Sequence, residues 1–312
     1  NVLERLMSGK RFDEIDFSKL PSVAGMRYSH CFSTREELKE RYAEFMANTD
    51  TKVNAAALFP YDCAVKATKV DCMPYGSTER EAVNKFRANL PDYIGENDAS
   101  NFMCVCDTSG SMTWANHNPL PIDVATSLSI YFAERAKGPF HNHYISFASR
   151  PQLIEVEGVD FCDKVDRIVK TNLCENTNIE GAFDMLLSTA IANRVKQSDL
   201  PEYIIVISDM EFDSATGNYS WGRRNTSQIN SRNAETVMEG IERKWNQSGY
   251  AMPKLIFWNV QARQNNIPML GNDYVSYVSG FSPSIFQSII TGKTGYDLMM
   301  ECLNKERYAV IA

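Results

Sequence analysis

A short apolar run that ends in a carboxylate and two hydroxyls is the feature that most constrains this chain. Residues 102–112 read FMCVCDTSGSM, with Asp107 directly after the run and Ser109 and Ser111 at alternate positions behind it. An apolar run of this length, followed at once by polar residues and glycine, is typical of the carboxyl end of a buried parallel strand. Ligands of open α/β sheets bind at that edge, so the feature predicts both a fold class and a site.

A second apolar run, YIIVISD at residues 203–209, also ends in an aspartate, Asp209. Between the two runs, Thr177 stands at the start of a segment with helical spacing of apolar residues, where it is expected to cap the helix. Three loops at the carboxyl ends of strands would then bring two carboxylates and three hydroxyls together. Hard oxygen ligands with little total charge suit Mg²⁺, which keeps several of its waters.

The order of the remaining elements predicts a doubly wound sheet. Strand-like runs occur at 102–106, 143–148, 152–157, 203–208, 254–260 and 274–279, and helical patterns lie at about 121–136, 162–171, 178–194, 232–248 and 282–308. Only the turn signal SRP separates the second and third runs, so these two are expected to pair antiparallel. Every other connection is long enough for a right-handed helical crossover. The expected fold class is α/β: a doubly wound, mostly parallel six-stranded sheet with one antiparallel edge strand.

The first hundred residues follow a different pattern. Helical signals and one turn-like stretch alternate there: helices at 33–49, 52–70 (interrupted by Pro60) and 77–94, and a turn at 16–25. We therefore expect an α-helical region over residues 1–98, which packs on the sheet or ends a larger helical domain, and a sheet domain over residues 99–312. The chain begins at Asn1 rather than Met, so we expect a fragment or a processed product.

Charge and cysteine content limit the class of protein. Residues 1–100 carry 14 Lys and Arg against 16 Asp and Glu, and residues 101–312 carry 18 against 23, so neither part is basic. This balance argues against nucleic-acid binding driven by overall positive charge, although it leaves room for a local basic patch. The longest apolar runs are far shorter than a membrane span, and no signal peptide is visible. The eight cysteines contain no C-x-x-C pair, so we expect free thiols and a cytoplasmic protein.

The ligand set and the order of elements resemble the metal-ion-dependent adhesion site (MIDAS) of von Willebrand factor type A domains, over roughly residues 100–310. The resemblance implies a Rossmann-like fold and one Mg²⁺ (or Mn²⁺) site formed by Asp107, Ser109, Ser111, Thr177 and Asp209. Asp209 is expected to hold metal-bound water. In such sites the metal keeps an open coordination position, which an Asp or Glu of a partner protein commonly completes. The implied function is a divalent-metal-dependent binding module that recognises an acidic group, and not an enzyme.

Six stretches narrow the resemblance: IDFSKLPSVAG, KVNAAALFPYD, CDTSGSM, ISDMEFD, IFWNV and VSGFSPSIF. Together they are similar to a family of plant, bacterial, phage and giant-virus proteins in which a helical region precedes a von Willebrand A domain. The layout also resembles the Ro autoantigen (TROVE) proteins, in which a helical-repeat ring binds small RNAs and a von Willebrand A domain closes the ring. The alternative function is therefore a Ro-like small-RNA-binding scaffold with an auxiliary metal-binding domain, although this chain has no obvious basic helical array.

A long polar segment, residues 214–233, follows Asp209 closely, where it would overhang the metal. Four side chains of this segment and of the stretch after Ser111 form a candidate rim for the partner: Trp114, Trp221, Arg223 and Arg224. A solvated mobile loop is an equally weighted interpretation. A metal-dependent enzyme is the third hypothesis and ranks lowest, because no nucleophile, base or basic phosphate clamp is identifiable in the sequence.

Overall fold

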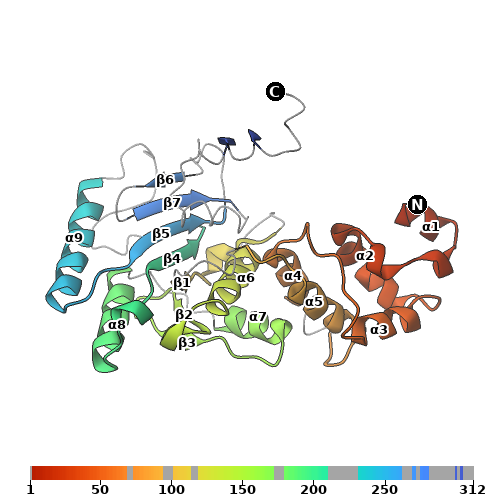
Figure 1. Cartoon of the computed structure of the whole chain (residues 1–312), viewed down its shortest axis with the longest axis horizontal. Coiled ribbons are helices and arrows are strands. Elements are labelled where there is room, and N and C mark those ends of the chain that lie inside the picture. Colours follow the sequence, from red (N-terminus) through yellow and green to blue (C-terminus); the bar gives the residue numbers. More distant parts are fainter. Residues whose placement is uncertain are drawn as a thin grey trace.

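The computed structural model describes residues 2–68, 73–93, 101–113, 119–171, 179–209, 231–261, 269–271, 275–280, 299–300 and 303–304. Within these residues, a helical region lies beside a sheet domain, and the first helix is far from the sheet (Figure 1). The layout expected from the sequence, helices before an α/β domain, is therefore observed.

The described part of the helical region contains five helices: α1 (Leu3–Ser8), α2 (Ser22–Thr34), α3 (Lys39–Ala47), α4 (Pro60–Ala67) and α5 (Thr78–Ala88). Helix α5 starts where its capping signal predicts, with the Ser77 hydroxyl accepting a hydrogen bond from the Arg80 amide. Pro60 begins α4 instead of interrupting a helix, because proline lacks an N–H and its fixed φ suits the first helical position. Helix α2 begins inside the stretch that was expected to be turn-like.

Seven strands form one sheet in the order β3-β2-β1-β4-β5-β7-β6 within the described residues. Their bounds are β1 Phe102–Cys106, β2 His143–Ser146, β3 Leu153–Glu155, β4 Tyr203–Ser208, β5 Lys254–Asn259, β6 Met269–Gly271 and β7 Val275–Ser279. The pairs among β2, β1, β4, β5 and β7 are parallel, and β3 is antiparallel to β2 as predicted. The α/β fold class is confirmed, and β6 adds a short antiparallel strand at the other edge.

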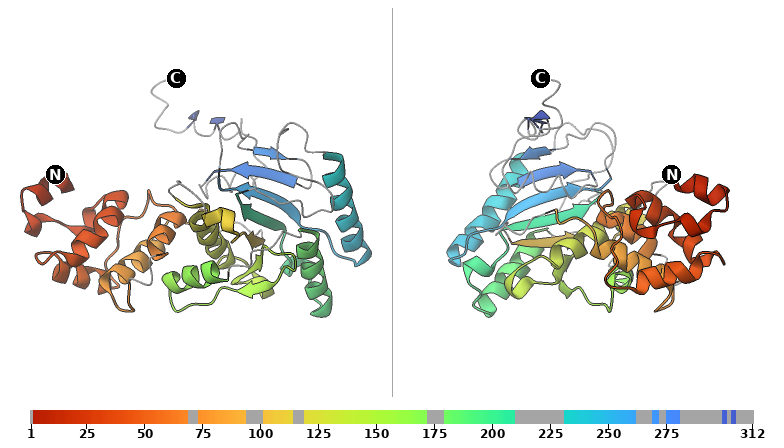
Figure 2. Two further views of the ribbon diagram at one scale, coloured as in Figure 1. Left: turned by 180° about the vertical axis from the view of Figure 1, so that it is seen from behind. Right: turned by 45° about the vertical axis from the view of Figure 1, so that its right-hand side comes forward.

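Helices cover both faces of this sheet (Figure 2). Four of them have the bounds α6 Pro121–Ala133, α7 Phe161–Lys170, α8 Ile179–Ala192 and α9 Ser231–Gln247. Successive strand residues point to opposite faces, so Cys104 and Cys106 join the core with α6 and α7, while Met103 and Val105 join the core with α8 and α9. Cys104 and Cys106 therefore share one face, as their alternation predicts.

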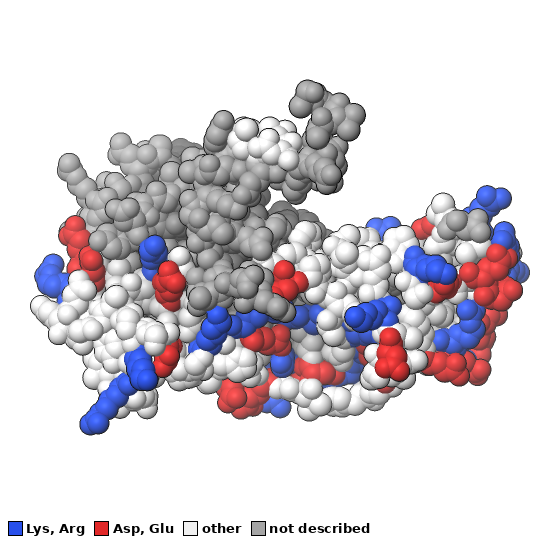
Figure 3. Space-filling view, viewed as in Figure 1, with Lys and Arg blue, Asp and Glu red and all other residues white. Residues whose placement is uncertain are grey.

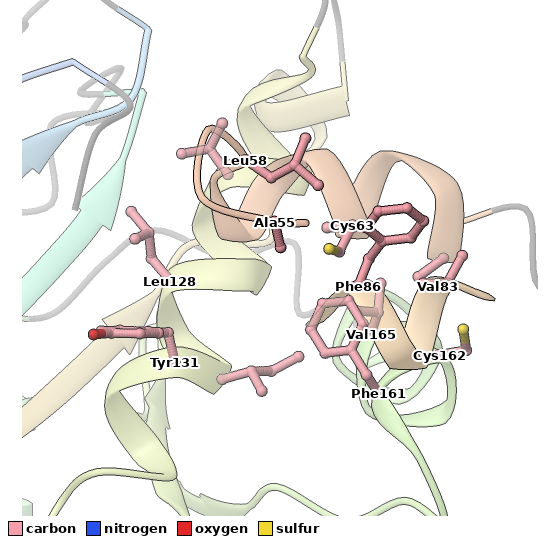
Figure 4. Packing of buried hydrophobic residues seen from close by; sticks show 14 of the residues in the cluster. Ala55, Leu58, Cys63, Val83, Phe86, Leu128, Tyr131, Phe161, Cys162 and Val165 are labelled. Atoms are coloured by element: carbon pink, nitrogen blue, oxygen red, sulfur yellow. The ribbon is translucent and has the colours of Figure 1, made fainter. Parts of the chain in front are cut away.

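The helical region shares a core with one face of the sheet domain. All thirteen residues of α6 are buried, because the sheet covers one side of this helix and α4 packs on it from outside. This cover buries the polar residues of α6 as well as its apolar ones: Asp123, Thr126, Ser127 and Ser129. Figure 4 shows Phe86 of α5 beside Phe161 and Val165 of α7, and Leu128 of α6 belongs to the same core cluster. The two parts are therefore joined by apolar packing.

A buried cation also joins the two parts. The guanidinium of Arg80 on α5 binds both carboxylate oxygens of Asp160 at 2.7 and 2.8 Å and also pairs with Asp163. Asp160 caps the amino end of α7 by accepting a hydrogen bond from the Asp163 amide at 3.0 Å. Tyr75 donates its hydroxyl to Asp163, and its ring lies 4.0 Å from the Arg80 guanidinium carbon. This network fixes α5 against the start of α7.

The sequence predicts free cysteines and no apolar run long enough to span a membrane, and the described residues bear on both predictions. The five cysteines in the described part of the chain carry free thiols: Cys31, Cys63, Cys104, Cys106 and Cys162. None of the described helices combines the length and apolar character that crossing a bilayer requires.

Candidate functional site

The candidate site lies where β1 and β4 end. These strands are parallel neighbours, paired from Phe102 with Tyr203 to Cys106 with Ile207, so their carboxyl ends reach the same edge of the sheet. Asp107 follows β1 directly and is 2% exposed, and Asp209 follows β4 and is 6% exposed. The two aspartates predicted from the apolar runs therefore meet at one buried edge.

The loop after β1 arranges the oxygen atoms of the first motif. The Asp107 carboxylate accepts a hydrogen bond from the Ser109 amide at 2.9 Å. A short 3-10 helix, Gly110–Thr113, follows in this loop. The hydroxyl oxygens of Ser109 and Ser111 lie 3.1 Å apart. A carboxylate and two hydroxyls thus lie close together in a single tight loop, as the D-x-S-x-S spacing predicts.

The loop after β4 is tied to this first loop at two points. The Ser208 hydroxyl donates to Oδ2 of Asp107 at 2.6 Å, and the amide of Asp209 donates to the sulfur of Met112 at 3.2 Å. Ser208 and Met112 are both fully buried. These contacts hold the two loops in a fixed relation to each other.

Electrostatics at this edge favour a cation. Burial raises the pKa of Asp107, the nearby charge of Asp209 raises it further, and the hydrogen bonds from Ser208 and Ser109 oppose both effects. Two carboxylates that raise each other's energy in a buried place are stabilised by a positive ion between or beside them. Carboxylate and hydroxyl oxygens are also the donors that Mg²⁺ and Mn²⁺ prefer, so the residues present fit such an ion.

A different kind of metal centre has no support in the described residues, where no three His, Cys, Asp or Glu side chains gather as a metal site. The candidate set has two carboxylates and several hydroxyls, so it is not a group of three such side chains.

Among the predicted residues, the structure brings Asp107, Ser109, Ser111 and Asp209 together at one edge. The others, Thr177 and the rim residues Trp114, Trp221, Arg223 and Arg224, lie outside the described residues. The metal itself stays a prediction.

The sequence-based prediction did not include Ser208 or Met112. In the sequence Asp209 is the counterpart of Asp107, since each aspartate follows an apolar run. The observed register pairs Cys106 with Ile207, so the residue beside Asp107 is Ser208, and Asp209 lies one position further along. A hydroxyl at the last position of an otherwise apolar strand was the available signal.

The charge distribution bears on the RNA-binding alternative. On the face seen in Figure 3, Lys and Arg side chains of the helical region alternate with Asp and Glu side chains. That face therefore offers no continuous basic surface of the kind that nucleic-acid affinity requires.

Comparison with known proteins gives three findings. Residues 101–307 match a protein family described as a domain of unknown function, DUF7788. The chain is 28% identical over 310 residues to an uncharacterized protein of Acanthamoeba polyphaga mimivirus. The alignment covers 94% of this chain and 50% of that protein. The chain is also similar to the crystal structure of the Deinococcus radiodurans Ro (RSR) protein, at 15% identity and a TM-score of 0.45, over 94% of this chain and 53% of that one.

The chain thus spans about half the length of the relatives that it matches. The family match begins at the residue before β1 and covers the sheet, the candidate site and more than half of the chain. The chain therefore belongs to the DUF7788 family.

Proposed function

We propose that the edge formed by the ends of β1 and β4 is a divalent-metal site of the von Willebrand A type, and that the bound metal receives an acidic group of a partner protein. The observation that supports this proposal is the meeting of Asp107, Ser109 and Ser111 with Asp209 at one buried sheet edge. Thr177 completes the proposed ligand set.

The donor set favours Mg²⁺ or Mn²⁺. Asp107 would bind the ion through its carboxylate, Ser109 and Ser111 through their hydroxyls, and Asp209 would hold metal-bound water. A hydroxyl can turn toward a cation, because its two lone pairs are free to accept while its proton is donated elsewhere. When bound, the ion supplies positive charge and an open coordination position.

The small charge of the site explains why an acidic partner is proposed. If Asp107 is the only carboxylate in direct contact, the neutral hydroxyls leave a divalent ion with positive charge that attracts a carboxylate from outside. The proposed role is binding and not catalysis. The five free thiols in the described residues support an intracellular location, where cysteines stay reduced.

Calorimetric titration of metal-stripped protein with Mg²⁺ and Mn²⁺ tests the metal site. The wild type is expected to bind one ion, and Asp107→Ala is expected to abolish binding. The control is Asp166→Ala, which removes a half-buried carboxylate on α7 that pairs with the exposed Lys170. Equal isotherms for wild type and Asp107→Ala would refute the site.

Selection from a displayed peptide library tests the partner chemistry. Peptides are captured on the immobilised protein in Mg²⁺ and released with EDTA. The released sequences are expected to share an Asp or Glu, and replacing it by Asn or Gln is expected to abolish capture. Release of peptides without a required acidic residue would refute the recognition of an acidic group while leaving the metal site intact.

A further inference from the structure

We infer that Ser208 is a positioning residue of the metal site: its hydroxyl holds the Asp107 carboxylate in the orientation in which a divalent ion binds. This inference rests on the proposed function. Ser208 does not belong to the expected ligand set, and its role follows from its contact with the Asp107 carboxylate.

The contact between Ser208 and Asp107 is short and buried. Ser208 is the last residue of β4, and its hydroxyl lies 2.6 Å from Oδ2 of Asp107. Ser208 is 0% exposed and Asp107 is 2% exposed, so water does not compete well for this hydrogen bond. A hydrogen bond from a neutral hydroxyl to an ionised carboxylate is among the stronger kinds in proteins.

Both ends of the carboxylate are held in this way. The Ser109 amide donates to Oδ1 at 2.9 Å while the Ser208 hydroxyl donates to Oδ2. Rotation of the carboxylate would break one of these bonds, so the group keeps one orientation. A carboxylate that is fixed beforehand loses less conformational freedom when an ion binds, and hydrogen-bond partners of metal ligands commonly change metal affinity for this reason.

The same contact fixes the second loop. Ser208 directly precedes Asp209, whose amide donates to the Met112 sulfur in the turn after Ser111. Ser208, at the end of β4, therefore contacts the carboxylate of the loop after β1, and the next residue, Asp209, contacts that loop through its amide. Loss of this hydroxyl is expected to loosen the relation between Asp107 and Asp209 as well as the orientation of Asp107.

A matched pair of substitutions isolates the hydroxyl. Threonine and valine have nearly the same shape and both suit a strand, but only threonine can donate a hydrogen bond. We therefore compare Ser208→Thr with Ser208→Val, and use Ser208→Ala as a variant without added volume. The control is Ser146→Ala, which removes a buried hydroxyl at the end of β2, the strand on the other side of β1 from β4; this hydroxyl accepts a hydrogen bond from the Gln152 amide.

Two measurements are made on each variant of this 312-residue chain. Electron paramagnetic resonance of free Mn²⁺ gives metal affinity, and urea unfolding in EDTA gives stability without metal. We expect Ser208→Val and Ser208→Ala to weaken Mn²⁺ binding about 10- to 100-fold. Ser208→Thr is expected to bind within a few-fold of wild type, and Ser146→Ala is expected to bind Mn²⁺ as wild type does.

The outcomes separate this inference from the proposed function. Wild-type affinity in Ser208→Val, together with loss of binding in Asp107→Ala, overturns the positioning role and keeps the metal site. Equal weakening in the Thr and Val variants also overturns it, because the added methyl and not the hydroxyl would be the cause. A wild-type protein that binds no Mn²⁺ refutes both proposals.

Discussion

Replacing Arg80 by methionine tests the polar link between the helical region and the sheet domain. Arg80 is 4% exposed, and the side chains of its partners Asp160 and Asp163 are 20% and 13% exposed. Methionine keeps most of the apolar length of the side chain but removes the cation, so two largely buried carboxylates at the start of α7 lose their counterion. Asn84 still donates to Asp160, and Tyr75 still donates to Asp163.

The expected loss follows from the burial of these groups. Removing one partner of a buried ion pair costs about 3–5 kcal/mol, because the remaining charge is left uncompensated. We expect a value near the lower end, about 3 kcal/mol, since the aspartates keep other hydrogen bonds and some contact with water. Equilibrium unfolding in urea at pH 7 measures the change in the free energy of unfolding.

The matched control is Arg167→Met, which removes an ion pair with Glu157 whose side chains are 57% and 63% exposed. Exposed pairs contribute about 0–1 kcal/mol, so the control is expected to change stability little. A loss below about 1 kcal/mol for Arg80→Met would refute the reasoning, because the network would then behave like a surface pair.

The pH dependence provides a second check on the same variant. Burial acts to raise the pKa values of Asp160 and Asp163, but their hydrogen bonds with Arg80 and neighbouring groups hold both values below the usual range. Carboxyls with lowered pKa values stabilise the fold above their unfolded pKa, and this stabilisation is lost as the pH falls through the folded pKa. The difference in stability between wild type and Arg80→Met should therefore be full at pH 7 and narrow below about pH 4.

Three further predictions concern the metal, the helical cover and RNA. Mg²⁺ at roughly 100 times its Kd should stabilise wild type by about 2.7 kcal/mol and raise its Tm more than that of Asp209→Ala; equal shifts would place the ion elsewhere. Residues 99–312 alone should show less cooperative thermal unfolding than the whole chain, since α6 loses the cover of α4; an equally sharp transition would contradict this. Filter binding should show only weak affinity for structured RNA at physiological salt, whereas submicromolar, salt-sensitive binding would favour the Ro-like scaffold.

The central strands could be predicted from the sequence because they are buried on both faces. Strands β1, β4 and β5 are near-continuous apolar runs. Nearly all of their residues are buried, so apolar and polar residues do not alternate along them. Strand β6, Met269–Gly271, has only three residues, which is too short for any periodicity to appear.

Helix α2 was harder to predict because its sequence lacks a clear apolar stripe. It contains Gly25, which lowers helix propensity, yet the residue lies inside the helix. A β-carbon at this position would lie 3.1 Å from the ring of Phe86 on α5, so glycine permits a close approach of the two helices. Tertiary packing of this kind leaves little signal in the local sequence.

The sequence predicts only those site residues whose position in a local motif marks them. Asp107 and Asp209 follow apolar runs, and Ser109 and Ser111 follow Asp107 at a fixed spacing, so the sequence indicated all four. Ser208 acts on Asp107 across 101 residues through the register of two strands. That register depends on the pairing of whole strands, which no single segment encodes.

Crystals of the protein grown with Mn²⁺ test the central claim most directly, because anomalous scattering locates the ion itself. We expect one strong peak at the ends of β1 and β4, within coordination distance of an oxygen of Asp107 and of the hydroxyl oxygens of Ser109 and Ser111. The peak should be absent from crystals of Asp107→Ala grown in the same way. A peak on other carboxylates of this acidic protein, or none at this edge, would contradict the claim.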